Sequence, residues 1–530
     1  MKPKQRTALI TIVGVWFLTA TLLLVATNAF AQSRPAPGNI YSQIQLFSEV
    51  LQKLKQNYVT ELSDEELIEA AIKGMLSSTD PHTNYFTADQ FKDFTTSTRG
   101  SFGGLGIQID KIGDYITVVS PIEGTPAFRM GITAGDKIVK VDGESIVGVT
   151  TDESIKKMRG DVGSEVVITI SRPGIPDLID FNIVRENIKI NSVPYSFKMD
   201  NGAGYIRISQ FNENTTTDLR SALAELEAEG IAGLIIDLRF NPGGLLDQAV
   251  DTVNEFIGYH KLVVETKGRN RQDALYTRYN TKERNYPIVV LVNEASASAS
   301  EIFAGSLQDW DKGLVVGKNT FGKGSVQQLI PLSNRNGIKI TTSYYYIKSG
   351  RCIHKMSNDK LLIGKQVTDE ELQKENEENH DQVYYTSKGR EVYGGGGITP
   401  DIVIDNDLLT RFGVELRRKN LFFNYAVDYL VDHGHQVSEN PVITPEIMNE
   451  FLDYARAEGV SYTAADLDSA SAFIESSIKS ELVRKVHGDL ASYKISISQD
   501  NQLQKAISLF DRFRTLEEMF IYAEEYQKER

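Results

Sequence analysis

Cysteine is almost absent from this sequence, and its absence excludes two kinds of stabilisation. Cys352 is the single cysteine among 530 residues, so the chain forms no internal disulfide. A metal cluster built from several cysteines is excluded for the same reason. Stability must therefore come from packed cores. We expect Cys352 itself to be buried and inert rather than catalytic.

A surplus of basic residues is also lacking. The chain has 57 Lys and Arg against 71 Asp and Glu, a formal net charge of −14 at pH 7. Because phosphate binding needs patches of Lys and Arg, this balance argues against a nucleic-acid partner. The chain is too long for one hydrophobic core, so we expect three or four folding units.

The first 31 residues have the order of an export signal. A basic start is followed by an uncharged apolar run from Ala8 to Ala26 and by small residues at Ala29 and Ala31. This order is typical of a secretory signal peptide. The run is also about as long as a membrane-spanning helix, so an uncleaved anchor stays an alternative. Both alternatives place the body of the chain outside the cytoplasm, in the periplasm or cell envelope.

Residues 38–98 carry a helical pattern. Apolar side chains recur at the spacing of one helix face, at Ile44, Phe47, Leu51 and Leu54. Ser63 and Glu66 have the spacing of a capping box, which predicts the start of a second helix. The segment Asp80–Thr83 ends this unit.

Residues 99–185 predict a small β module with two helical inserts. Strands are expected at 116–119, 135–143 and 165–171, and helices at 152–158 and from residue 125 to just before Gly131. This order resembles a PDZ domain over its whole length. In that family the loop that corresponds to Gly104, Leu105, Gly106 and Ile107 presents backbone N–H groups to the terminal carboxylate of a peptide. The strand that follows then pairs with the peptide. The alternative is that these glycines serve only a tight turn.

Residues 186–405 alternate strands with helices, which predicts an α/β domain. Strands are expected at 203–208, 232–238, 288–292, 314–316 and 338–346, and helices at 216–228, 246–256 and 298–308. The acidic stretch 370–381 is expected to be a solvated insertion.

Residues 406–530 return to a helical pattern, for which we expect a small helical domain. Thr444 can cap a helix that has Pro445 at its first position and Gly459 just past its end. Apolar stripes through residues 474–482 and 509–525 are most simply core faces.

Two strand-to-helix turns in the α/β region carry residues suited to chemistry. The turn Asn241–Gly244 contains two glycines, so its backbone N–H groups are free to hold an anion. Ser298 lies within a run of small residues that ends at Glu301, and it falls at a helix N-terminus, where the dipole favours developing negative charge. Taken alone, Ser298 is more simply a helix cap.

A third segment places Lys323 between Gly322 and Gly324. Glycine neighbours let a lysine lie close to the backbone and away from its usual solvated position. Taken alone, the segment is equally a surface turn. A fourth segment is the strand 341–346, with turn residues after it through Arg351.

Together these segments resemble the S41 family of carboxy-terminal processing peptidases, also called tail-specific proteases. The resemblance runs from about Ile40 to Asp405. It rests on the run ending at Glu301, the Phe-Gly-Lys-Gly segment around Lys323, the Asn-Pro-Gly-Gly turn, and Gly397–Asp401. It implies a multidomain α+β chain with an N-terminal helical segment, a PDZ domain, an α/β serine protease core of the crotonase or ClpP-like type, and a C-terminal helical domain.

The same resemblance implies the roles of individual residues. Ser298 corresponds to the nucleophile, Lys323 to the general base and Gln327 to the polar partner that orients the lysine. The N–H groups of Ala299 and Gly244 correspond to the oxyanion hole. A lysine can act as a base only when neutral, so burial must lower its pKa from about 10.4 by roughly three units. No metal or nucleotide is required.

Three other functions fit the sequence less well. A Ser-His-Asp triad is disfavoured because no serine has a Gly-x-Ser-x-Gly context, and His260 and His354 are expected to be structural or surface residues. A nucleotide-binding loop is rejected because Gly324 stands where such a loop needs Ser or Thr. The last alternative is a PDZ-bearing binding or scaffold protein with an inactive core, since fold alone does not determine function.

We therefore predict a serine endopeptidase that acts on proteins or peptides with exposed C-termini. The sequence leaves open which substrate it cuts, and whether a homodimer or a regulatory adaptor controls it.

Overall fold

The computed structural model describes residues 39–122, 124–355, 368, 374, 382–405, 409–434 and 436–528. Contacts divide the chain into two compact units, with the division between Thr79 and Asp80. The predicted signal peptide or anchor, residues 1–31, and most of the acidic stretch 370–381 lie outside the described residues. Among the helices that are described, none is long and apolar enough to cross a membrane.

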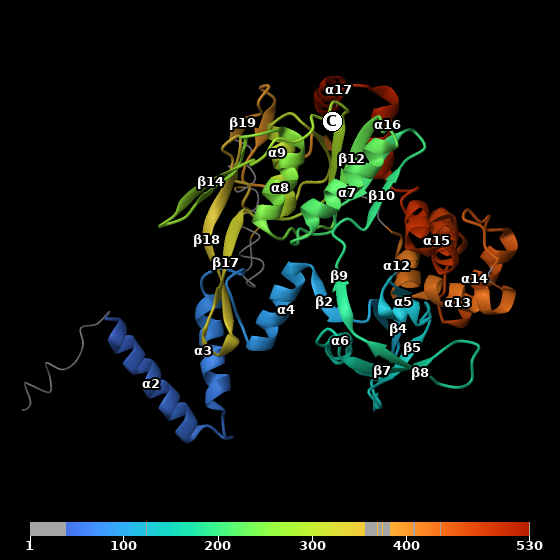
Figure 1. Cartoon of the computed structure of the whole chain (residues 1–530), viewed down its shortest axis with the longest axis horizontal. Coiled ribbons are helices and arrows are strands. Elements are labelled where there is room, and N and C mark those ends of the chain that lie inside the picture. The colour runs from blue at the N-terminus through green and yellow to red at the C-terminus, as the bar shows by residue number, and fades with distance from the viewer. Residues whose placement is uncertain are drawn as a thin grey trace, which may run out of the picture. The chain divides into compact units, whose positions relative to one another are not determined.

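The described residues of the first unit form two helices, as predicted, α2 (Ile40–Asn57) and α3 (Asp64–Ser77) (Figure 1). Ser63 caps α3, because its hydroxyl accepts a hydrogen bond from the Glu66 N–H at 3.5 Å. The second unit opens with strand β1 (Asn84–Phe86) and helix α4 (Ala88–Arg99). The prediction of helix alone was wrong at β1, which is too short to show a strand periodicity and is fixed by pairing with a distant strand, β18 (Gly337–Ile347).

The β module folds as predicted around its own apolar core. Its strands are β2 (Ser101–Gly104), β3 (Ile107–Ile112), β4 (Tyr115–Pro121), β5 (Lys137–Val141), β6 (Glu144–Ser145), β7 (Glu165–Ser171), β8 (Ile179–Val184) and β9 (Glu186–Lys189), and its helices are α5 (Pro126–Arg129) and α6 (Thr151–Met158). The main path of its sheet runs β3-β4-β5-β7-β8, which leaves β3 at an edge. Ile116, Val118 and Ile138 are completely buried between the strands and helices.

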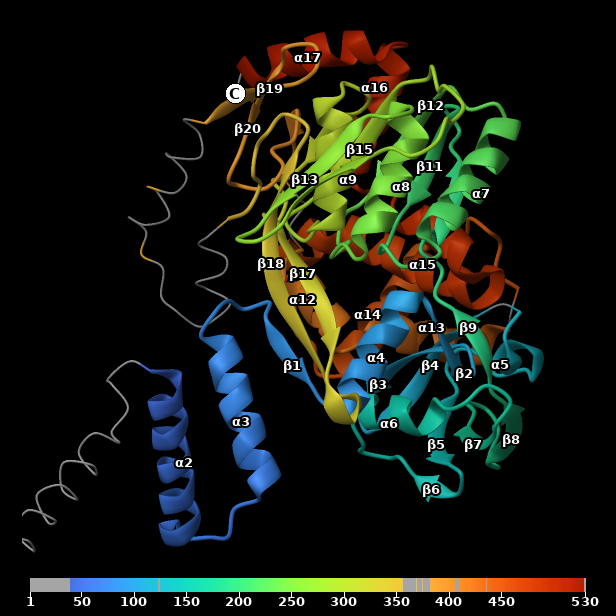
Figure 2. The same cartoon turned by 60° about the vertical axis from the view of Figure 1, so that its left-hand side comes forward.

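The α/β core is built on a six-stranded sheet in the order β10-β11-β12-β15-β16-β21. These strands are β10 (Tyr195–Lys198), β11 (Ala203–Arg207), β12 (Gly233–Asp237), β15 (Ile288–Val292), β16 (Leu314–Gly317) and β21 (Ile402–Val403). All neighbours pair in parallel except β10 with β11. One face packs on α7 (Thr215–Ala228), α8 (Leu246–Ile257) and α9 (Ala299–Asp309), the three predicted helices (Figure 2).

The other face of this sheet packs on the last two helices of the chain, α16 (Asn501–Arg512) and α17 (Leu516–Lys528). The sequence predicted one apolar stripe over residues 509–525. That prediction was wrong in treating the segment as one continuous stripe, because α16 ends at Arg512 and a separate helix, α17, begins at Leu516.

A second sheet has the order β1-β18-β13-β14, formed by β1, β18 (Gly337–Ile347), β13 (Leu262–Lys267) and β14 (Gln272–Tyr276). Strand β17 (Ser325–Pro331) also pairs with β18. Only β18 was predicted. Strands β14 and β17 were missed because exposed and half-exposed residues dominate them, so that they resemble loops. A small hairpin of β19 (Val383–Tyr385) and β20 (Glu391–Tyr393) follows.

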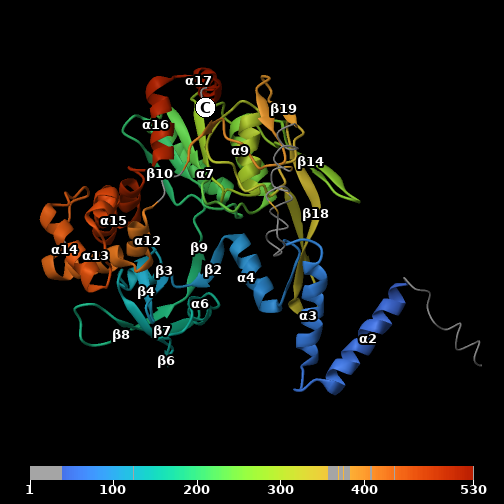
Figure 3. The same ribbon diagram turned by 180° about the vertical axis from the view of Figure 1, so that it is seen from behind.

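Four helices precede α16 and pack around a separate core: α12 (Arg411–Arg418), α13 (Leu421–His433), α14 (Pro445–Ala457) and α15 (Ala464–Ser496) (Figure 3). Thr444 caps α14 as predicted, with Pro445 at its first position. Helix α15 folds back on itself at Gly488, and its two arms are joined by a 2.8 Å contact between the hydroxyls of Ser480 and Ser492.

Candidate active site

The two predicted turns lie side by side at the carboxyl ends of neighbouring parallel strands, β12 and β15. The Asn241 carbonyl accepts hydrogen bonds from the Ala297 N–H and the Ser300 hydroxyl, both at 3.0 Å. The two turns approach each other so closely that a Cβ added to Gly243 would lie 2.8 Å from the Cβ of Ser298. In open α/β sheets, ligands bind at this end of the strands.

Ser298 is held in an uncommon backbone conformation immediately before α9. Its φ of 56° and ψ of −113° lie outside the regions that non-glycine residues ordinarily occupy. Such strain persists only when neighbouring contacts fix it, and it clusters at active sites. Here the Ser298 N–H donates to Glu301 at 2.7 Å, and the Ser298 carbonyl accepts from Tyr345 at 3.1 Å.

Lys323 is half-buried in a tightly packed loop. A Cβ on Gly322 would lie 2.8 Å from the Cβ of Lys355, and a Cβ on Gly324 would lie 2.8 Å from the backbone nitrogen of His354. Both flanking glycines are therefore required for this backbone path. The Lys323 N–H donates to Glu301 at 2.9 Å.

Glu301 links the two segments, and the sequence analysis gave it no role. Its side chain is fully buried. Oε2 accepts from the N–H groups of Ser298 and Lys323, while Oε1 accepts from the Gly322 N–H at 2.7 Å and the Thr320 hydroxyl at 2.5 Å. Burial raises the pKa of Glu301, although its hydrogen bonds act in the opposite direction. The Ser-x-x-Glu spacing of a capping box was the signal that could have identified it.

Tyr345 makes a second link between the same two segments. Its hydroxyl donates to the carbonyls of both Ser298 and Lys323, and its side chain is buried within the core. Burial raises the pKa of Tyr345 well above its ordinary value, and the Glu301 charge adds to this effect. The hydroxyl therefore stays protonated and remains a donor.

Two backbone N–H groups near Ser298 have no acceptor within the described part of the chain: those of Gly244 and Ala299. The Gly243 N–H, in contrast, donates to the Asn241 side chain at 2.9 Å. Gly244 has a φ of 150°, and a Cβ there would lie 2.0 Å from the carbonyl oxygen of Phe211. Only glycine can occupy this position.

Gln327 lies on β17, just after a shift in the register of its pairing with β18. Its side-chain nitrogen donates to the hydroxyls of Ser325 at 2.9 Å and Thr341 at 3.4 Å. The Thr341 hydroxyl in turn donates to Asp80 at 3.0 Å. The structure thus connects Gln327 to a polar chain that reaches Asp80.

The predicted peptide loop joins β2 to β3. Gly104 ends β2 and Ile107 begins β3, so Leu105 and Gly106 form the connection. The carbonyls of these two residues accept hydrogen bonds from Ala127 at 3.0 Å and Ile122 at 2.8 Å. The loop is therefore anchored through its carbonyl groups, at the start of an edge strand.

The remaining candidate residues have packing roles. Cys352 was expected to be buried, but it is partly exposed, because it ends the β18 hairpin. Burial of the rest of the side chain raises the pKa of its thiol, which disfavours the reactive thiolate. His354 is buried and its Nδ1 accepts from the Gly324 N–H at 3.3 Å. His260 stacks on the ring of Tyr276.

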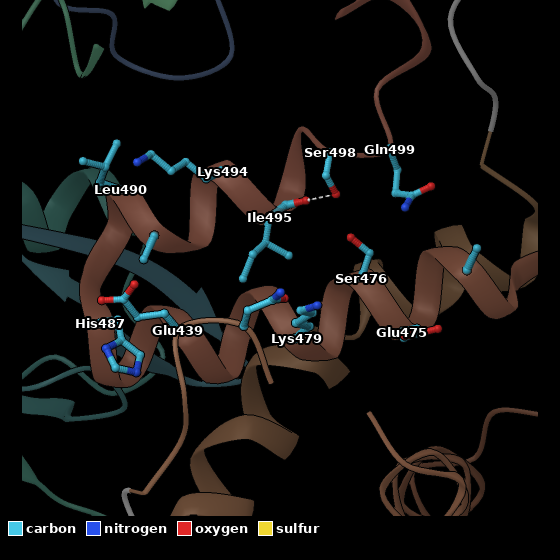
Figure 4. A pocket seen from close by; sticks show the side chains of 13 residues that line it. Glu439, Glu475, Ser476, Lys479, His487, Leu490, Lys494, Ile495, Ser498 and Gln499 are labelled. Atoms are coloured by element: carbon cyan, nitrogen blue, oxygen red, sulfur yellow. Dashed lines mark hydrogen bonds between the residues drawn. The ribbon is translucent and has the colours of Figure 1, made fainter. Parts of the chain in front are cut away.

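A cavity of about 560 Å³ lies between the two arms of α15, with Lys479, His487 and Lys494 in its wall (Figure 4). None of the residues predicted for catalysis lines it. The site defined by Ser298 and Lys323 is therefore distinct from this cavity.

Comparison with known proteins agrees with the architecture. Residues 202–359 match the peptidase family S41, residues 103–183 match the PDZ domain, and residues 18–90 match the activating protease CtpB N-terminal domain. These matches define a serine-type peptidase with a PDZ domain.

Relatives identify the family more closely. The chain is 41% identical over 345 residues to the carboxy-terminal-processing protease of Bartonella bacilliformis, covering 64% of this chain and 78% of that protein. It is 33% identical over 356 residues to the carboxy-terminal processing protease CtpA of Bacillus subtilis, covering 67% and 76%. The photosystem II D1 C-terminal processing protease is 26% identical, covering 67% of this chain and 86% of that chain, with a TM-score of 0.37.

The chain belongs to the S41 family of carboxy-terminal processing proteases. The predicted fold class and enzyme class are confirmed, and no match favours the alternative of an inactive binding protein.

Proposed function

We propose that this protease cuts polypeptides with a Ser298–Lys323 dyad. The observation that carries the proposal is the double link between the two residues: one carboxylate oxygen of Glu301 accepts from both backbone N–H groups, and one phenol, Tyr345, donates to both carbonyls. These links fix the separation of the two segments without using either reactive side chain. A nucleophile and its base need such fixed positions.

The proposed reaction proceeds through an acyl-enzyme. Neutral Lys323 takes the proton of the Ser298 hydroxyl while the serine oxygen attacks the substrate carbonyl carbon. Collapse of the tetrahedral intermediate breaks the peptide bond, and the lysine ammonium gives its proton to the leaving amine. Lys323 then takes a proton from water, whose oxygen attacks the ester. As the ester bond breaks, the lysine ammonium returns this proton to the Ser298 oxygen, which releases a carboxylic acid and restores the serine hydroxyl and the neutral lysine.

The oxyanion hole in this proposal consists of the Gly244 and Ala299 N–H groups. The support is that Ala299 follows Ser298, that Gly244 follows Gly243, whose added Cβ would lie 2.8 Å from the Cβ of Ser298, and that both N–H groups are free of internal acceptors within the described residues. Preorganised donors of this kind stabilise the charge that develops on the substrate oxygen. Gln327 is assigned to orient Lys323 on the family resemblance, and Gln327→Ala should lower the rate without preventing folding.

We further propose that the PDZ domain captures the free C-terminus of the substrate. The edge position of β3 leaves room for one more strand, and residues 104–107 stand at its start. The inactive Ser298→Ala chain should bind a fluorescent apolar peptide with a free carboxylate, but bind the same peptide with an amidated terminus at least about tenfold more weakly. Equal binding of both peptides would contradict carboxylate recognition.

Export to the periplasm or cell envelope is part of the proposal. Its support is the basic start, apolar run and small residues of positions 1–31. Intact-mass measurement of the protein from its native host distinguishes the two forms: loss of 31 residues indicates a signal peptide, and retention indicates an anchor. A full-length protein found only in the cytoplasm would overturn export.

The dyad is tested by incubating the purified protein with casein and, separately, with a fluorophosphonate probe. Ser298→Ala and Lys323→Ala should each reduce cleavage by at least about 10³-fold with an unchanged circular dichroism spectrum. Lys318→Ala is the matched lysine control, because Lys318 lies in the same connection and its partly exposed ammonium lies 4.0 Å from the Asp405 carboxylate. Cleavage at the wild-type rate by either dyad variant would exclude the mechanism.

A further inference from the structure

Arg239 connects the turn of the proposed oxyanion hole to the rest of the molecule. It lies between strand β12 and residues 241–244, and only 7% of it is exposed. Its Nε and Nη2 donate to the carboxylate of Asp237, the closest contact being 2.7 Å, and its backbone N–H donates to the same group at 2.9 Å. Burial alone would raise the pKa of Asp237, but the charges of Arg239 and Arg207 hold it below its ordinary value.

The remaining nitrogen of this guanidinium reaches the C-terminal helices. Nη1 donates to Asp500 at 2.8 Å and to Gln502 at 3.1 Å. Asp500 also caps α16 by accepting from the Leu503 N–H at 2.9 Å. Gln502 is 1% exposed and donates to the carbonyl of Ile404 at 2.8 Å. Both acceptors are thus held by hydrogen bonds of their own, in addition to those with Arg239.

A second connection starts at the end of α15. The hydroxyl of Tyr493 is 2.7 Å from that of Tyr205, which donates to Asp237 at 2.8 Å. The Tyr493 ring also stacks on Tyr195, with centroids 3.7 Å apart. Asp237 is therefore held from the core side and from the C-terminal side at once.

Strain is concentrated between Arg239 and the glycines. Phe240 has a φ of 60° and is 65% exposed, so neither an ordinary conformation nor burial fixes it. Its N–H donates to the side chain of Asn293 at 2.9 Å. The Asn241 side chain then donates a hydrogen bond to the Ile208 carbonyl and accepts one from the Gly243 N–H. Residues 239–243 are consequently held by hydrogen bonds at Arg239, Phe240, Asn241 and Gly243, and they lead directly to Gly244.

We propose that the C-terminal helices take part in catalysis through this segment: Asp500 and Gln502 are positioning residues that hold Arg239, and thereby aim the Gly244 N–H at the substrate oxyanion. The inference rests on the proposed function of the dyad and its oxyanion hole. It assigns residues 493–502 a role in turnover rather than in substrate binding alone. Loss of the link should therefore lower kcat while leaving KM nearly unchanged.

The surroundings of the link permit a clean test. Arg239, Phe240, Asp500 and Gln502 all line one cavity of about 820 Å³, so shortening Asp500 leaves no sealed void. Asp500→Ser keeps a hydroxyl that can cap α16, but the side chain is too short to reach Arg239. Asp500→Asn keeps both the cap and an acceptor for the guanidinium.

The matched control is Asp511→Ser, on the same helix. Asp511 accepts from Asn201 at 3.2 Å, so this substitution also removes one contact between α16 and the core, with the same change in charge. We expect Asp500→Ser to lower kcat about tenfold with KM within about twofold, since a misaimed donor costs less than a deleted one. Asp500→Asn should recover most of the loss, and Asp511→Ser should match the wild type.

Each outcome decides the inference when Ser298→Ala is measured in parallel. If Ser298→Ala is inactive but Asp500→Ser has a wild-type kcat, the positioning role of Asp500 is overturned. The proposed dyad is then unaffected. Equal losses in Asp500→Ser and Asp511→Ser also overturn it, because they indicate general loosening of α16. An active Ser298→Ala removes both proposals. Should Asp500→Ser not fold, Tyr493→Phe tests the second connection, with about a threefold fall in kcat expected and no change in kcat counting against the role.

Discussion

The backbone N–H groups of Ser298 and Lys323 donate to the same atom, Oε2 of Glu301, at 2.7 and 2.9 Å. The two residues are far apart in sequence and come from different segments, yet one carboxylate oxygen sets the distance between their backbones. The geometry of the proposed dyad is thus established in the backbone before any substrate binds.

Glu301→Gln should therefore damage catalysis more than stability. The amide keeps one acceptor oxygen, but its NH₂ group faces backbone donors, so one of the two segments must shift. We expect kcat to fall about 100-fold and the free energy of unfolding to fall by about 1–3 kcal/mol. Steady-state kinetics and urea unfolding measure the two effects. Wild-type kcat in this variant would show that the shared carboxylate does not position the dyad.

Tyr345→Phe removes the second link, which is the pair of hydrogen bonds from the Tyr345 hydroxyl to the Ser298 and Lys323 carbonyls, and keeps the aromatic ring. The carbonyl of Ser298 keeps its bonds to the N–H groups of α9, so the loss in stability should be about 1 kcal/mol. We expect kcat to fall about tenfold because the Lys323 segment loses one of its ties. Tyr344→Phe, on the adjacent position of the same strand, serves as the control, and an equal effect there would argue against a specific role.

Gly244→Ala should abolish activity, because its Cβ would lie 2.0 Å from the Phe211 carbonyl oxygen and force the turn to move. Gly258→Ala is the control that measures the effect of backbone strain without a steric clash. Gly258 also has a positive φ, 85°, but a Cβ there meets nothing within 4 Å. It should cost about 1 kcal/mol of stability and leave kcat unchanged. Fluorophosphonate labelling of both variants distinguishes them.

Stability should rise with pH in a window set by Lys485. Burial lowers the pKa of Lys485 from 10.5 to about 7, and its ammonium has no hydrogen-bond acceptor within the described residues. Between about pH 7 and pH 10 the unfolded chain binds this proton and the folded chain does not, so the free energy of unfolding increases with pH there.

Lys485→Met should remove that dependence. At pH 6 we expect the variant to be more stable than the wild type by on the order of 2 kcal/mol, with the difference shrinking by pH 9. Lys494→Met is the control: Lys494 also lies over a phenylalanine ring, but its side chain is exposed. A difference between Lys485→Met and wild type that is the same at both pH values would contradict the pKa shift.

Much of the active-site region was predictable because its signals are local. Glycines on both sides of Lys323, and small residues leading to Ser298, mark close backbone approaches that a single sequence reveals. The parallel strands of the main sheet are continuous apolar runs, which also stand out without an alignment.

What could not be predicted depends on contacts between distant segments. The role of Tyr345 exists only because Ser298, 47 residues away, folds against it. Asp500 looks like an ordinary helix cap until Arg239 is brought beside it, 261 residues away. Strands β13, β14 and β17 gain their structure from pairing rather than from their own composition.

The packing of α16 and α17 on the second face of the main sheet also keeps that face out of water. Leu503, Phe510 and Met519 cover apolar residues of β12, β15 and β16 that would otherwise be exposed. A large exposed apolar face promotes association between molecules. A chain cut before Asn501 should therefore aggregate rather than persist as a free α/β core.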